Sequence, residues 1–156
     1  MADLHRRAQV SQASNARYLA STAAVERTTT VGQSLAPLCR PVTTRAGVRS
    51  RALRPFDADD MKLLDAVGRG EFAINGLRNR DVRDLLWGTD EGTDAALTRR
   101  RSGQVTRQLR LLRAHGVIKR VPRTHRYLLT DKGRTLVTLL KAAQDADTKR
   151  LTAIAA

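Results

Sequence analysis

Basic side chains without acidic neighbours mark residues 95–130. This window holds ten Lys or Arg and no Asp or Glu, although the whole chain has 15 acidic residues. Guanidinium and ammonium groups bind phosphate and carboxylate oxygens, and a carboxylate beside them would weaken that binding. The separation of charge therefore predicts a polyanionic partner for this window.

Composition narrows the class of partner. The 156 residues carry a net charge of +14, and the excess is not confined to a tail: residues 1–50 have 7 Lys or Arg against 2 acids, and residues 51–156 have 22 against 13. We expect nucleic acid as the partner. An anionic membrane surface is disfavoured, because no basic helix has the Trp, Phe and Leu face that docks there. RNA ranks below double-stranded DNA, since only 3% of the residues are aromatic and able to stack on bases.

Length and apolar content fit one domain with an appendage. Hydrophobic residues make up 41% of the chain, which is close to the globular norm. No apolar run approaches the ~18 residues of a membrane span, and no signal-peptide core follows Met1. The single Cys39 excludes an intramolecular disulfide and a multi-cysteine zinc site. We therefore expect a cytoplasmic protein without membrane contact.

The sequence shows no clear catalytic or metal-binding motif. No nucleotide-binding loop, carboxylate pair or Ser–His–Asp set stands out, and the acids cluster near expected helix starts at 57–65 and 81–94. His115 and His125 lack a Cys or carboxylate within 95–130 to complete a metal site. We expect a protein that is not an enzyme and that binds no metal or cofactor.

Helical and strand patterns alternate from residue 51 onward. Asp57, Asn79 and Thr130 stand at N-cap positions, and Phe56 stands where a hydrophobic staple would place it. Apolar residues then recur at helical spacing after each cap. The expected elements are helices over 57–67, 80–87, 95 or 102 to 115, and 131 onward, a strand over 71–74, and two hairpin strands over 117–121 and 126–130.

The first 50 residues form a separate N-terminal segment ahead of a main domain over 51–156. Residues 3–25 are rich in Ala and lack Gly and Pro, which predicts a helix. Its small side chains favour packing on the main domain; a homodimer through this helix and the last one is the alternative. A loop over 28–41 and a short hairpin around Arg45–Gly47 follow. The predicted fold is mainly α with a small β-wing.

Two short sequence segments also resemble a known protein family. The segment VTRQLRLLRAHGVIKR, residues 105–120, followed by YLLTDKGR, residues 127–134, resembles the recognition helix, wing and following helix of MarR-like winged helix-turn-helix regulators. The resemblance covers about 57–145 and implies double-stranded DNA binding and transcriptional regulation. One departure is the long stretch after Trp87, which exceeds the ~3–4-residue turn of a compact helix-turn-helix and leaves the angle between the two helices open.

A second resemblance leads to an alternative function. The chain looks like the C-terminal part of longer, uncharacterised bacterial proteins of mobile-element or plasmid neighbourhoods. It would then be a non-catalytic fragment that tethers a larger protein to DNA.

The expected recognition helix, about 102–115, has two contrasting faces. Val105, Leu109 and Leu112 form one apolar seam at helical spacing. The opposite face is small, hydroxylic and cationic. Its expected roles are close backbone approach at Gly103, guanine contacts by Arg107 or Arg110, and phosphate contacts by Arg100, Arg101, Ser102 and Thr106, with Arg99 extending this footprint.

The wing, residues 117–130, is the second expected contact. A hairpin beside an inserted helix lies along the sugar-phosphate backbone, where a carboxylate would be repelled. Arg123 at the tip is placed to enter a narrow minor groove. The candidate wing contacts are Lys119, Arg120, Arg123, Thr124, His125 and Arg126.

Overall fold

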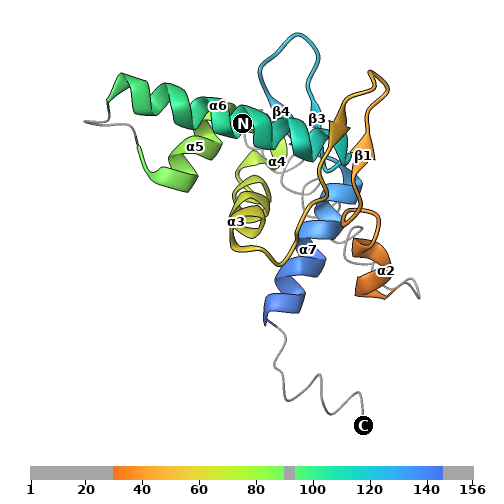
Figure 1. Cartoon of the computed structure of the whole chain (residues 1–156). Coiled ribbons are helices and arrows are strands. Elements are labelled where there is room, and N and C mark those ends of the chain that lie inside the picture. The colour runs from red at the N-terminus through yellow and green to blue at the C-terminus, as the bar shows by residue number, and fades with distance from the viewer. Residues whose placement is uncertain (1–29, 90–93, 146–156) are drawn as a thin grey trace, which may run out of the picture.

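The computed structural model describes residues 30–89 and 94–145, and these ranges are mainly helical. They contain six helices and two small antiparallel hairpins. In Figure 1 the long helix α6 (Ala95–Ala114) crosses above α3 (Ala58–Val67), and α7 (Asp131–Asp145) runs downward, away from it. The helix expected over residues 3–25 lies outside the described residues, as does any homodimer contact that it makes.

The described part of the N-terminal segment starts with a short helix that the sequence analysis missed. Helix α2 (Val31–Leu35) replaces part of the loop expected over 28–41. The Thr30 hydroxyl accepts from the Gln33 N–H at 3.2 Å, and the Gln33 side chain accepts from the Thr30 N–H at 3.1 Å. This capping box starts a helix in a segment with little apolar periodicity. The loop prediction is therefore wrong for these five residues.

The first hairpin follows where the sequence predicted it. Strand β1 (Val42–Thr43) pairs antiparallel with β2 (Arg49–Ser50), with Val42 opposite Ser50. Gly47 adopts φ 75° in the connection, a left-handed conformation that glycine tolerates best. The expected turn around Arg45–Gly47 is confirmed.

Helix α3 begins and ends as its sequence signals predict. The Asp57 carboxylate accepts a hydrogen bond from the Asp59 N–H at 3.1 Å, and Gly68 caps the C-terminal end. The expected staple is wrong, because Phe56 is 68% exposed and does not pack on the helix.

A turn of helix stands where a strand was expected. Residues Phe72–Asn75 form α4, which ends at Gly76 with φ 69°. Four alternating residues are too few to distinguish a strand from one helical turn, so the strand over 71–74 is a wrong prediction. The strand-like pairing occurs slightly later: Leu77 and Tyr127 exchange two backbone hydrogen bonds, each 2.8 Å long.

The central helices and the second hairpin follow. Helix α5 (Asn79–Trp87) ends at Gly88. Helix α6 begins at Ala95, the earlier of its two expected starts, with Asp94 as N-cap. Strand β3 (Ile118–Arg120) pairs with β4 (Tyr127–Leu129), with Ile118 opposite Leu129. The expected cap of α7 is confirmed, because the Thr130 hydroxyl accepts from the Gly133 N–H at 3.0 Å.

One apolar core joins these elements. The expected seam of α6 is buried, and it meets side chains from α2, α3, α5, β3 and α7. Each fully buried Leu or Val stabilises the fold by about 1.5–3 kcal/mol relative to an exposed one. Fully buried members include Leu63, Val67, Leu77, Val82, Val105, Leu112 and Ile118.

Helix α7 passes very close to the start of the wing. A Cβ built on Gly133 would lie 2.1 Å from the Val117 carbonyl oxygen. Only glycine fits at this crossing, so α7 fixes the base of the β3–β4 hairpin against the end of α6. Within the described ranges, no helix is both long and apolar enough to cross a membrane.

Candidate nucleic-acid interface

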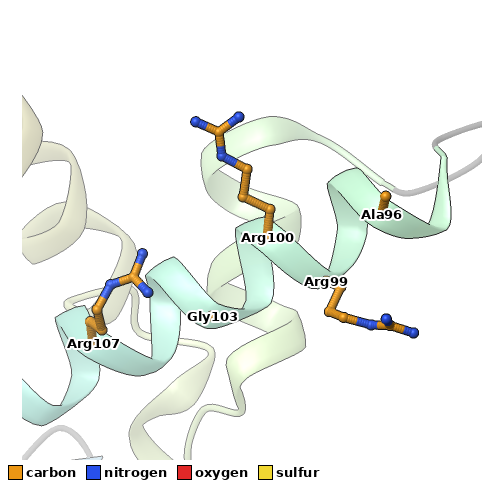
Figure 2. Close-up of a pocket in the computed structure, with 5 residues that line it drawn as sticks. All are labelled: Ala96, Arg99, Arg100, Gly103 and Arg107. Atoms are coloured by element: carbon orange, nitrogen blue, oxygen red, sulfur yellow. The ribbon is translucent and has the colours of Figure 1, made fainter.

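The face of α6 opposite the buried seam is open and cationic. Arg100, Arg107 and Arg110 are exposed, as the helical spacing predicts. A hollow of about 390 Å³ lies on this face, and Figure 2 shows the residues that line it: Ala96, Arg99, Arg100, Gly103 and Arg107. Two small residues, Ala96 and Gly103, thus lie among the three arginines of the hollow. The surface offers guanidinium donors around a short stretch of bare helix backbone.

Gly103 is not required by the packing of the protein. A Cβ at this position would meet only the Nη1 atom of Arg107, at 3.8 Å, which is an ordinary contact with a flexible side chain. Glycine inside a helix costs about 0.5–1 kcal/mol relative to alanine. The fold therefore gives no reason for glycine here. In Figure 2 the Arg107 side chain extends toward Gly103, whereas Arg99 and Arg100 leave the helix on different sides.

The predicted phosphate donors Ser102 and Thr106 are already engaged inside the protein. The Asn79 amide donates to the Ser102 carbonyl oxygen at 2.9 Å and to the Thr106 hydroxyl at 3.0 Å. In return, the Ser102 hydroxyl donates to the Asn79 side chain at 3.1 Å, and the Thr106 hydroxyl donates to the Ser102 carbonyl at 2.9 Å. The Ser102 hydroxyl proton thus joins α6 to α5, and the Thr106 hydroxyl proton is used within α6.

The same network corrects the role expected of Asn79. This residue is the first of α5 rather than its N-cap, and Arg78 takes the cap position. The Asp81 carboxylate accepts from the Arg78 backbone N–H at 2.7 Å. Asn79 is consequently free to bind α6, a contact that spans more than 20 residues of sequence and has no local signal.

Arg101 lies against α5 instead of standing free on the surface. Its guanidinium carbon is 5.8 Å from the centre of the Trp87 ring, and both side chains are partly buried. Such a cation–π contact stabilises by about 0.5–1 kcal/mol when exposed to solvent. The charge of Arg101 remains near the basic face, but its position is set by Trp87.

Some polar side chains of the wing form hydrogen bonds within the protein, and others are exposed on its surface. Within the turn, the Arg120 Nε donates to the Thr124 carbonyl oxygen at 3.0 Å, and the Thr124 hydroxyl donates to the Val121 carbonyl at 3.0 Å. The Arg126 guanidinium donates to the Asn75 carbonyl at 2.7 Å, which ties β4 to α4. The first two bonds lie within the hairpin and define its turn, and the third attaches the hairpin to α4.

Four basic residues of the wing are exposed: Lys119, Arg120, Arg123 and His125. Arg123 has φ 58° and is the one non-glycine residue of the described ranges with a positive φ. A left-handed conformation is uncommon for a long side chain. It turns the chain tightly at the tip, directly after Pro122.

His115 is the C-cap of α6, at the end that the sequence predicted, and its side chain is buried. It is 3% exposed, its Nε2 atom lies 2.8 Å from the Arg51 carbonyl oxygen, and its own carbonyl accepts from the Lys132 ammonium at 3.1 Å. His115 thereby joins α6, α7 and the segment after β2. In the part of the chain that the structure describes, no three His, Cys, Asp or Glu residues are grouped to hold a metal.

An ion pair between the buried Asp60 and the half-exposed Arg51 was not predicted from the sequence. The Asp60 side chain is 2% exposed, and it accepts from the Arg51 guanidinium at 2.7 Å and from the Arg54 backbone N–H at 2.8 Å. Burial raises the pKa of the Asp60 carboxyl, but the bonds from Arg51 and Arg54 outweigh burial, and its pKa lies below the ordinary value. The hydrogen bond to Asp60 in turn raises the pKa of Arg51. This pair fastens the segment after β2 to α3.

The described surface can bind a polyanion through arginines on one helix and cations on one hairpin. Both elements begin and end within the acid-free window, so no carboxylate of residues 95–130 opposes them. Comparisons with protein-family models, curated proteins and solved structures find no match to this chain. The resemblance to MarR-like regulators therefore stays a prediction.

Proposed function

We propose that this chain binds double-stranded DNA, with α6 in the major groove and the β3–β4 hairpin on the adjacent sugar-phosphate backbone. The observation that carries the proposal is the exposed, acid-free face of α6, where arginines surround the bare backbone at Gly103. A helix of 20 residues is about 30 Å long. The major groove is about 12 Å wide and admits such a helix.

The arrangement proposed for the elements is a winged helix-turn-helix over residues 57–145. Its support is the order helix, helical turn, bridge residue, helix, helix, hairpin, helix, and the single bridge between Leu77 and Tyr127, which pairs one further residue with the wing. Transcriptional regulation is the use of DNA binding that this arrangement favours.

Each group on the surface takes a different part in the proposed complex. Arg107 and Arg110 point away from the core and contact base edges, where a bidentate Arg–guanine pair contributes about 1–3 kcal/mol of discrimination. Arg99 and Arg100 neutralise phosphates beside the groove. On the wing, Lys119, Arg123 and His125 contact the sugar-phosphate backbone.

Four of the originally predicted contacts have other roles. Ser102 and Thr106 hold α5, Arg101 lies on Trp87, and Thr124 shapes the turn of the wing. We leave these four out of the proposed contact set. Arg120 and Arg126 also bind backbone carbonyls, so their charges contribute through proximity.

Two substitutions separate base reading from backbone binding. Arg107→Ala removes a proposed base contact, so duplexes selected from a random pool should show a relaxed preference at one position. Arg123→Ala removes a backbone contact, so all duplexes should bind more weakly and the salt dependence should become flatter. Lys141→Ala is the charge-matched control, because Lys141 is exposed on the end of α7 that points away from α6 in Figure 1. Equal, sequence-independent losses for both variants would contradict a reading role for Arg107.

A further inference from the structure

A second acid-free window spans the end of the N-terminal segment and the first residues of the main domain. Residues 27–56 contain six Arg and no Asp or Glu, the same separation of charge as in 95–130. The described part of this window forms α2 and the β1–β2 hairpin. The sequence analysis treated it as an appendage.

The base of the β1–β2 hairpin is fixed to the C-terminal end of α6. The Arg51 carbonyl oxygen lies 2.8 Å from the buried His115 Nε2, and the Arg51 guanidinium binds the buried Asp60. The Leu53 N–H donates to the Leu38 carbonyl at 2.9 Å, and both of these leucines are buried. The β1–β2 hairpin is therefore attached to the core of the protein by buried contacts at its base.

The second hairpin of the protein starts from the same place. Strand β3 begins at Ile118, directly after the His115–Gly116 end of α6. In Figure 1 both hairpins project upward in the view, near the end of α6 that leads into β3. Two acid-free hairpins thus extend in one direction from one end of the proposed recognition helix.

The outer part of the β1–β2 hairpin keeps two arginines for a partner. Arg45 in the turn and Arg49 on β2 are exposed, and neither side chain forms a hydrogen bond or ion pair with another described residue. Arg51, by contrast, is committed to Asp60. The division matches the wing, where some cations define the hairpin and others face outward.

We propose that the β1–β2 hairpin is a second DNA-contacting hairpin, which lays Arg45 and Arg49 on phosphates of the same duplex beyond the C-terminal end of α6. This inference rests on the proposed function. A phosphate backbone fits better than a base edge, because strands of two residues offer guanidinium charge and few groups for reading sequence. The hairpin extends the footprint and the affinity without adding sequence preference.

The test replaces both arginines in the full chain, as Arg45→Gln with Arg49→Gln. Binding to a fluorescent random-sequence duplex of 30 base pairs is measured by anisotropy from about 50 to 200 mM salt. Losing two phosphate contacts should flatten the log–log salt slope by about 2 and weaken binding up to about 60-fold at 0.1 M salt, since each contact contributes a slope of about 0.9. The thermal midpoint should not change.

Two further variants make the outcome specific. Arg69→Gln with Lys141→Gln removes the same charge from exposed sites outside both windows, and its slope should equal that of the wild type. Arg107→Ala with Arg110→Ala reports on α6 alone. If the wild type binds and the α6 variant is weakened while the hairpin variant matches the wild type, the second contact is wrong and the proposed function stands. If the wild type does not bind at all, both are wrong.

Discussion

Replacing Gly103 by Ala should make the protein more stable and its DNA complex weaker. The added Cβ meets nothing closer than the Arg107 guanidinium at 3.8 Å, so no overpacking opposes the better helix propensity of alanine. The gain is up to about 1 kcal/mol, which raises the melting temperature of a domain of this size by about 4 °C. In the proposed complex the same methyl group stands between the helix backbone and the groove.

A DNA-binding surface is distinguished from a merely solvated one by two opposite effects of Gly103→Ala: folding stability increases and DNA affinity decreases. We expect the urea midpoint of Gly103→Ala to rise and the dissociation constant for DNA to increase by about tenfold, which corresponds to about 1.4 kcal/mol. Gly32→Ala is the matched control, because it also lies in a helix with open space around it and should change stability alone. A more stable Gly103→Ala protein that binds DNA as tightly as the wild type would refute the close approach of α6.

Three other substitutions test the scaffold that holds α6. Asn79→Ala removes three hydrogen bonds between α5 and α6 and should cost about 1–3 kcal/mol in urea unfolding; a double-mutant cycle with Ser102→Ala should show coupling of at least about 0.5 kcal/mol, and strict additivity would deny the contact. Asp60→Asn should cost about 1.5–3 kcal/mol at neutral pH, the range for hydrogen bonds to a charged group, because Arg51 is half exposed to solvent. Because the folded pKa of Asp60 is depressed, this difference from the wild type is fully present above about pH 4 and disappears as pH falls through the folded pKa; a difference that grows toward acid pH would contradict this direction. Gly133→Ala should destabilise by about 1–3 kcal/mol despite better helix propensity, because its Cβ meets a backbone carbonyl at 2.1 Å; a stabilised variant would show that α7 does not pass so close.

Elements with both a cap and a long apolar period could be predicted from the sequence. Helices α3, α6 and α7 each combine an Asp or Thr cap with buried residues at helical spacing. The wing alternates over five residues on each side of Pro122, which suffices for a hairpin prediction. Local signals decide such elements before any tertiary contact is known.

Short elements and long-range polar contacts escaped the same reasoning. One turn of helix at Phe72–Asn75 has too few residues to show a period, and α2 depends on the capping box of Thr30 and Gln33 rather than on an apolar period. Asp60 looked like one more acid in a first turn, but its partner Arg51 comes from a different segment. Sequence spacing cannot predict that Asp60 and Arg51 are in contact, because the two residues meet only in the folded protein.

The candidate site was predicted unevenly for the same reason. Exposure of Arg107 and Arg110 follows directly from their position opposite the apolar seam. Ser102 and Thr106 stand at the border of that seam, where α5 packs, and a wheel drawn for one helix cannot include the neighbouring helix. The acid-free composition of residues 27–56 is visible in the sequence, but the place of the β1–β2 hairpin at the end of α6 depends on the long-range contact between Arg51 and His115.

The most direct test of DNA binding is the salt dependence of affinity for random duplex DNA. Fluorescence anisotropy of the purified full chain between about 50 and 200 mM salt yields a log–log slope. We predict a slope of about −5 to −9, as expected when about 6–10 phosphates are neutralised. Absence of binding even at 50 mM salt would contradict the proposed function of α6 and of both hairpins.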